Sequence, residues 1–291
     1  MIHLDRKTEW DSGISPVDRP VFVVGSGRSG TTLLQRLFNS SPEFLIWGEH
    51  AGILKQIASL YETSRWSYLA ERLRVQPDDF ASREVALRDM GRWPGWDNAL
   101  SEQDFRKLCR DFVLSLFTSP GREPVRWGFK EPRYGIGASA KTLPFLHQMF
   151  PAARTVIVIR DPFTTVNSMV VAWYHQMNSH AEIDRWILKT ARWWTQIYER
   201  LFLFHHEFPA ASLILKYEDI HSPDSRSRLE AFLGVEHPLH KWDEILTVVQ
   251  DESDKEGEFS QRVRERLKEH WGPVLRMTNQ VRTLYGYQAP H

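Results

Sequence analysis

The stretch from Val21 to Phe38 reads VFVVGSGRSGTTLLQRLF. A short apolar run is followed by a glycine-rich turn and then by an amphipathic segment, an order that predicts strand, turn and helix. Backbone N–H groups of such a turn, together with the helix N-terminus, form an anion-binding site. The stretch therefore predicts a phosphate-binding loop near the start of an α/β domain.

The loop departs from a Walker A motif at one position. Gly25, Gly30 and Thr32 match the pattern G-x4-G-K-[ST], but Thr31 stands where the lysine belongs, and the nearby cation is Arg28. A Walker lysine reaches the β- and γ-phosphates of a nucleotide, and the neighbouring hydroxyl holds magnesium. Its loss argues against hydrolysis of a nucleoside triphosphate. Glycines that serve only tight packing are the alternative, but the crowding of polar residues in this turn favours an anion site.

Further apolar runs alternate with helical patterns along the chain. Strands are predicted at 21–24, 44–47 and 125–129, and within the segments RTVIVIRDP and ASLILKYEDI; helices are predicted at 31–39, 138–149 and 181–208, with another beginning at Pro162. Alternation of this kind predicts an α/β fold with a doubly wound, mostly parallel central sheet flanked by helices. Ligands of such sheets bind beyond the carboxyl ends of the strands.

The chain is expected to form a single domain, 1–291, with a sheet core at 20–49 and 125–220. Residues 50–120 are interpreted as a helical lid inserted between two strands, and residues 221–291 as C-terminal helices. The clearest helix of the insertion follows a cap at Ser101, and its predicted apolar face consists of Phe105, Leu108, Cys109, Phe112, Val113 and Leu116.

Composition narrows the class of partner. Lys plus Arg and Asp plus Glu number 37 each, so the formal net charge is zero and no global field favours nucleic acid or an anionic membrane. The single cysteine, Cys109, excludes an internal disulfide and a cysteine-based metal cage. The polar N-terminus has no apolar signal core, and no apolar run has the length of a membrane span. We therefore expect a cytoplasmic protein; its oligomeric state stays open.

A second anion site is predicted at another strand end. Arg160 closes the apolar run of RTVIVIRDP, and Ser168 lies eight residues later in the following helix. A guanidinium group offers a planar fork for a phosphate, and a serine adds a hydroxyl donor. Pairing of Arg160 with Asp161 or Glu131 is the alternative.

The segment GSGRSGTTLL resembles the 5′-phosphosulfate loop of sulfotransferases that use 3′-phosphoadenosine 5′-phosphosulfate (PAPS). The variant with arginine in the loop is typical of the bacterial, carbohydrate and protein-tyrosine branches. In this family an Arg…Ser pair with the same spacing holds the 3′-phosphate, and a Tyr-Glu position packs near the adenine. The resemblance implies that the nucleotide is bound by Arg28, Ser29, Gly30, Thr31, Thr32, Arg160, Ser168 and Tyr217. A nucleotide with both 3′ and 5′ phosphates fits two separate anion sites, and ATP does not.

The resemblance also implies the catalytic residues. In the protein-tyrosine branch a Gly-Glu segment about twenty residues after the loop arginine supplies the base, and Glu49 of the segment LIWGEH lies 21 residues after Arg28. Glu49 is thus the first candidate base and His50 the second. Lys130 in GFKEPR resembles the lysine that contacts the leaving phosphate oxygen, and Arg28 adds a second cation. The alternatives are a Glu49 carboxylate that only stabilises a helix N-terminus and a Lys130 that only pairs with Glu49 or Glu131.

Together these observations predict a PAPS-dependent sulfotransferase with a hydroxyl or amine of a small molecule or carbohydrate as acceptor, PAP (3′-phosphoadenosine 5′-phosphate) as product and no metal. Protein tyrosine is the alternative acceptor. A P-loop kinase or NTPase and a non-catalytic nucleotide-binding protein are the alternative functions. Candidates to face the acceptor are Trp173, Tyr174, His175, His180 and the segment RWPGW at 92–96.

Overall fold

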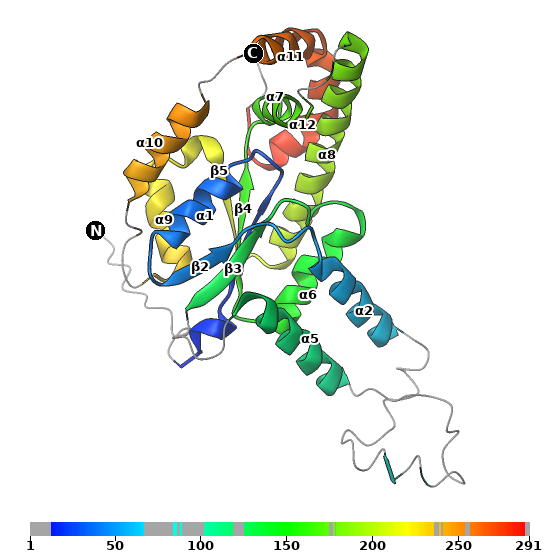
Figure 1. The fold of residues 1–291 in the computed structure, drawn as a ribbon, viewed down its shortest axis with the longest axis vertical. Coiled ribbons are helices and arrows are strands. Elements are labelled where there is room, and N and C mark those ends of the chain that lie inside the picture. Colours follow the sequence, from blue (N-terminus) through cyan, green and yellow to red (C-terminus); the bar gives the residue numbers. More distant parts are fainter. Residues whose placement is uncertain are drawn as a thin grey trace.

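A five-stranded parallel sheet forms the centre of the protein (Figure 1). The computed structural model describes residues 13–66, 84–85, 88, 102–118, 125–174, 177, 179–235, 239, 241–253 and 257–288. The strands are β1 (Val21–Gly25), β2 (Phe44–Trp47), β3 (Arg126–Glu131), β4 (Arg154–Ile159) and β5 (Ser212–Lys216), in the order β2-β3-β1-β4-β5. All four neighbouring pairs are parallel.

Helices fill the connections between the strands and continue after the last one. They are α1 (Thr31–Asn39), α2 (Leu54–Trp66), α5 (Glu102–Phe117), α6 (Thr142–Met149), α7 (Pro162–Trp173), α8 (His180–Glu207), α9 (Pro223–Leu233), α10 (Trp242–Ser253), α11 (Glu258–Glu269) and α12 (Trp271–Leu284). Short 3-10 turns occupy Pro16–Asp18, Gly137–Lys141 and Tyr217–Asp219. The predicted α/β class with a parallel sheet between helices is confirmed.

Side chains of each strand alternate between two cores because successive residues of a strand point to opposite faces of the sheet. Val21 and Val23 belong to the core that α1, α9 and α10 cover. Phe22 and Val24 belong to the larger core, which α6, α8 and α12 cover on the opposite face (Figure 1). Every residue of β1 is buried, as expected for a central strand covered on both faces.

The two longer helices described in the inserted region 50–120 pack on the larger core. Tyr61 of α2 and Val113 of α5 both belong to it. The apolar face predicted for α5 is partly wrong: Cys109, Val113 and Phe117 are buried, whereas Leu108, Phe112 and Leu116 are exposed. Apolar residues spaced three and four apart can line either of two overlapping faces of a helix. The face that packs against the core is the one that becomes buried. Ser101 and 92–96 lie outside the described residues.

All five strands point the same way, so their carboxyl ends meet at one edge of the sheet. The phosphate loop follows β1, and Glu49 lies two residues beyond β2. Arg160 follows β4, and Tyr217 follows β5. The fold therefore brings the predicted site residues to one edge. Among the described helices, none is both long and apolar enough to cross a membrane.

Candidate active site

The phosphate loop between β1 and α1 requires left-handed backbone at two positions. Arg28 has φ 62°, and Gly30, the N-cap of α1, has φ 101°. A Cβ atom on Gly30 would lie 2.4 Å from the ring of Tyr217, so only glycine allows this close approach. The loop leaves the first N–H groups of α1 directed to its mouth, where a helix accepts an anion.

Two aromatic side chains of helix α8 form hydrogen bonds with the phosphate loop and with β4 and the residue that follows it. The Tyr198 hydroxyl accepts a hydrogen bond from the Ser26 backbone N–H at 3.0 Å and donates one to the Val158 carbonyl at 2.7 Å. One turn away, the Trp194 indole N–H donates to the Arg160 carbonyl at 3.1 Å. Both aromatic residues lie in the helix predicted at 181–208, but no part in the site was predicted for either of them. The sequence did carry a signal for this role, because a buried tyrosine or tryptophan needs a hydrogen-bond partner for its polar atom.

The two predicted anion sites meet. Arg28 donates from Nε to the Ser168 hydroxyl at 3.0 Å, and Arg160 donates to the Arg28 carbonyl at 3.4 Å. The Arg160 guanidinium also lies 4.2 Å from the centroid of the Tyr217 ring. Asp161 caps α7 instead, accepting from the N–H groups of Phe163 and Thr164. These contacts place Arg28, Ser168, Arg160 and Tyr217 around one polar surface.

The loop hydroxyls differ in their access to a ligand. Ser29 is fully buried and donates to the Ser26 carbonyl at 2.7 Å. Thr31 is buried, whereas Thr32 is exposed and lines a cavity of about 700 Å³ between α1 and α10. Thr32 is therefore the loop hydroxyl that faces open space, whereas Ser29 is enclosed within the loop.

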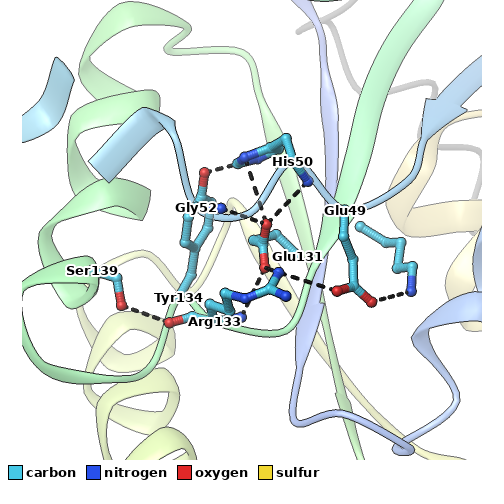
Figure 2. A network of polar contacts seen from close by, with 8 residues as sticks. Glu49, His50, Gly52, Glu131, Arg133, Tyr134 and Ser139 are labelled. Atoms are coloured by element: carbon cyan, nitrogen blue, oxygen red, sulfur yellow. Dashed lines mark hydrogen bonds and ion pairs between the residues drawn. The ribbon is translucent and has the colours of Figure 1, made fainter. Parts of the chain in front are cut away.

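Glu49 lies between two cations at the ends of β2 and β3 (Figure 2). Lys130 Nζ is 2.6 Å from Glu49 Oε1, and an Arg133 nitrogen is 3.1 Å from Oε2. Burial acts to raise the pKa of Glu49, but the hydrogen bond and charge of Lys130 and the charge of Arg133 outweigh it, so the pKa is lowered. Glu49 is consequently an ionised carboxylate with both oxygens engaged.

A second carboxylate, Glu131, organises the neighbouring turn (Figure 2). It is fully buried and accepts from Gly52 N–H at 3.0 Å, from His50 N–H at 3.3 Å and from the Arg133 side chain at 2.7 Å. Several donors satisfy a buried charge that would otherwise be costly. Glu131 thus fixes both the segment after Glu49 and the arginine that holds Glu49.

His50 points into the protein rather than toward the loop. Its Nε2 is 2.9 Å from the Tyr134 hydroxyl, and its ring packs edge-on against Phe129 with centroids 4.6 Å apart. Burial lowers the pKa of His50 more than the nearby charge of Glu131 raises it. Of the two candidate bases, Glu49 is the one beside Lys130.

The residues predicted to face an acceptor lie at different distances from the loop. The ring of Trp173 contacts Gly27 so closely that a Cβ there would meet it at 2.4 Å, and the side chain is about half exposed. Tyr174 stacks on Trp186 with centroids 3.7 Å apart, and His180 opens α8. His175 lies outside the described residues. Trp173 is thus the member of this group that reaches the phosphate loop.

The described residues contain no group of three or more His, Cys, Asp or Glu side chains arranged to hold a metal ion. The site is instead rich in cations: Arg28, Lys130, Arg133 and Arg160 surround Glu49 and the loop. Cations and backbone N–H groups at the carboxyl ends of parallel strands are typical of α/β proteins that bind nucleotides or other anions.

The chain belongs to the sulfotransferase family, whose family model matches residues 20–238. Protein-tyrosine sulfotransferase A from Caenorhabditis elegans is 25% identical over 160 residues, which are 55% of this chain and 35% of that protein. Human protein-tyrosine sulfotransferase 1 is 23% identical over 150 residues, 52% of this chain and 33% of its own length. The matched part thus spans about a third of these curated relatives.

Solved structures share the fold at low identity. The sulfotransferase domain from the curacin biosynthetic pathway has a TM-score of 0.52 and 16% identity, covering 94% of this chain and 99% of that one. The sulfotransferase domain from the Synechococcus PCC 7002 olefin synthase has a TM-score of 0.53 and 17% identity, with coverage of 94% and 97%. The predicted family is confirmed.

Proposed function

We propose that this protein transfers a sulfuryl group from PAPS to a hydroxyl or amine acceptor. The observation that carries the proposal is the convergence of two anion-binding elements with a carboxylate–lysine pair at one edge of the sheet. Arg28 contacts Ser168, Arg160 contacts the loop backbone, and Lys130 with Glu49 follows on the neighbouring strands. The residues fit a nucleotide with phosphates at both ends of its ribose.

We assign the nucleotide-binding roles by position. The N–H groups at the start of α1, with the Thr32 hydroxyl, bind the 5′-phosphate, as helix N-termini do. Arg160 and Ser168 bind the 3′-phosphate through charge-assisted hydrogen bonds. Tyr217 packs beside the base, since its ring already lies against Gly30 and Arg160.

PAPS supplies the sulfuryl group and a phosphate as the leaving group. A bond forms between the acceptor oxygen or nitrogen and sulfur, and the bond between sulfur and the bridging oxygen breaks. Glu49 accepts the acceptor's proton as general base. Lys130 and Arg28 stabilise the negative charge that develops on the bridging oxygen.

For the acceptor, we propose a small molecule or carbohydrate, with protein tyrosine as the second candidate. The support for the second candidate is the 25% and 23% identity of this chain to two protein-tyrosine sulfotransferases. A panel of sugars, phenols and tyrosine peptides with sulfur-labelled PAPS separates the two. Label transferred to tyrosine peptides alone would favour the second candidate.

Thermal unfolding with added nucleotide tests the donor class. PAP should raise the melting temperature without magnesium, because binding to the folded state stabilises it. ATP with magnesium, in contrast, should produce little change. Stabilisation by ATP with magnesium and not by PAP would reject the sulfotransferase proposal in favour of a kinase or NTPase.

A further inference from the structure

The two cations that hold Glu49 are anchored very differently. Arg133 is bound by its side chain to a second carboxylate, Glu131, at 2.7 Å, and its backbone N–H also donates to Glu131 at 3.2 Å. Glu131 is fully buried and cannot move without breaking the turn that contains Gly52. Arg133 is therefore a fixed partner for Glu49 Oε2.

Lys130 is the exchangeable partner. Within the described part of the chain, the one hydrogen bond of its side chain is the one that its ammonium donates to Glu49 Oε1 at 2.6 Å. Its long side chain starts from β3, where Lys130 is paired with Val23 of β1, two residues before Gly25. An ammonium on four flexible carbons can turn from Glu49 toward the loop without any movement of the backbone.

The observed pairing conflicts with the two roles proposed above. A carboxylate whose oxygens both accept charge-assisted hydrogen bonds is a weak base. Equally, an ammonium whose charge is balanced by a carboxylate stabilises a phosphosulfate less, although two of its three N–H donors remain. We therefore expect Glu49 and Lys130 to act fully only after the bond between Lys130 Nζ and Glu49 Oε1 has broken.

We propose that Lys130 is shared between Glu49 and the donor. In the arrangement observed, Lys130 holds Glu49 Oε1; when the donor binds, Lys130 moves to it, Arg133 keeps Glu49 in place through Oε2, and Oε1 becomes free to accept the acceptor's proton. The base is thus made available only after the donor has bound, which imposes a donor-first order. This inference rests on the proposed function.

The proposal makes Glu49 a competitor of the nucleotide for Lys130, and this is measurable without any acceptor. The experiment is a double-mutant cycle in which calorimetry gives the PAP dissociation constant of wild type, Glu49→Gln, Lys130→Met and the double variant. Circular dichroism and thermal melts verify that each variant is folded.

Glu49→Gln is expected to bind PAP about three- to fivefold more tightly than wild type, since partly exposed ion pairs contribute roughly 1 kcal/mol or less. Lys130→Met is expected to bind at least about tenfold more weakly, as for the loss of a charged hydrogen bond. In the Lys130→Met background, Glu49→Gln should have no further effect.

Two results overturn the inference while PAP still binds. One is unchanged or weaker binding by Glu49→Gln. The other is an equal decrease in the PAP dissociation constant when Glu49→Gln is introduced into wild type and into Lys130→Met. That result would show only that removal of a negative charge favours the binding of an anion. A wild-type chain that binds no PAP would instead overturn the proposed function, and the inference with it.

Discussion

In the proposed reaction Glu49 accepts the proton of the acceptor, so turnover should depend strongly on its carboxylate. Replacement by Gln keeps the size and removes the base. Turnover should fall by about 10²- to 10⁴-fold, the usual contribution of a general base. The measurement is the initial rate with labelled PAPS.

The control for this prediction is PAP binding, which Glu49→Gln should not weaken. Turnover near the wild-type rate would contradict the role of Glu49 and would direct attention to His50, although its ring nitrogen is engaged by Tyr134.

Gly30 is a position in the loop at which both the backbone conformation and a neighbouring ring oppose substitution. Gly30→Ala places a methyl group 2.4 Å from Tyr217 at a φ of 101°. The left-handed conformation costs about 1–2 kcal/mol, and the ring must move as well. PAP binding should weaken at least tenfold, measured by calorimetry.

Gly137 provides a matched control for this substitution. It has φ 54°, and a Cβ atom there meets nothing within 4 Å. Gly137→Ala should therefore lose some stability but keep PAP affinity. If both variants bound PAP alike, the contact between Gly30 and Tyr217 would have no part in shaping the site.

At the scale of elements, α8 holds the phosphate loop through one hydroxyl. Tyr198→Phe removes the partner of the Ser26 N–H and of the Val158 carbonyl. An unpaired buried polar group costs about 1–3 kcal/mol. The free energy of unfolding should fall by about that amount or more, and PAP binding should weaken because the loop loses its support.

Tyr285→Phe separates these two effects. The Tyr285 hydroxyl donates to the Tyr198 carbonyl at 2.9 Å, so its loss removes a buried hydrogen bond that does not reach the loop. Denaturant unfolding should show destabilisation in both variants, but calorimetry should show weaker PAP binding only in Tyr198→Phe. Equal affinities in the two variants would reject the supporting role of Tyr198.

At the scale of the whole molecule, we expect the buried side chain of His147 to make the free energy of unfolding depend on pH. Its ring is buried against Phe204 and Phe208 and is hydrogen-bonded to Thr155. Burial, with a smaller effect of the Arg154 charge, lowers the pKa of His147 from 6.5 to about 4.

The histidine stays neutral in the folded chain and becomes protonated in the unfolded chain below pH 6.5. Stability is therefore complete above pH 6.5 and falls as the pH drops toward about 4. At about 1.4 kcal/mol for each pH unit, the loss approaches about 3 kcal/mol. His147→Gln should flatten this dependence, measured by urea unfolding at pH 7.5 and pH 5; an unchanged slope would assign it to other groups.

Local pattern was sufficient to locate the strands of the sheet along the chain. The bounds of Phe44–Trp47 and Thr31–Asn39 agree with the prediction, because apolar runs bounded by turn residues report strands and helices directly. The helix predicted at 138–149 instead divides into a 3-10 turn, Gly137–Lys141, and α6. The apolar face of α5 was misjudged because helical spacing alone does not say which of two overlapping faces meets the core.

The sequence by itself determined that glycine-rich and basic motifs follow buried strands, since strand, turn and helix signals are local. Only the tertiary structure decided that Glu49 pairs with both Lys130 and Arg133, and that His50 turns inward to Tyr134. The reason is the strand order. Placing β3 between β2 and β1 brings segments about eighty residues apart into contact, and no local spacing specifies that order.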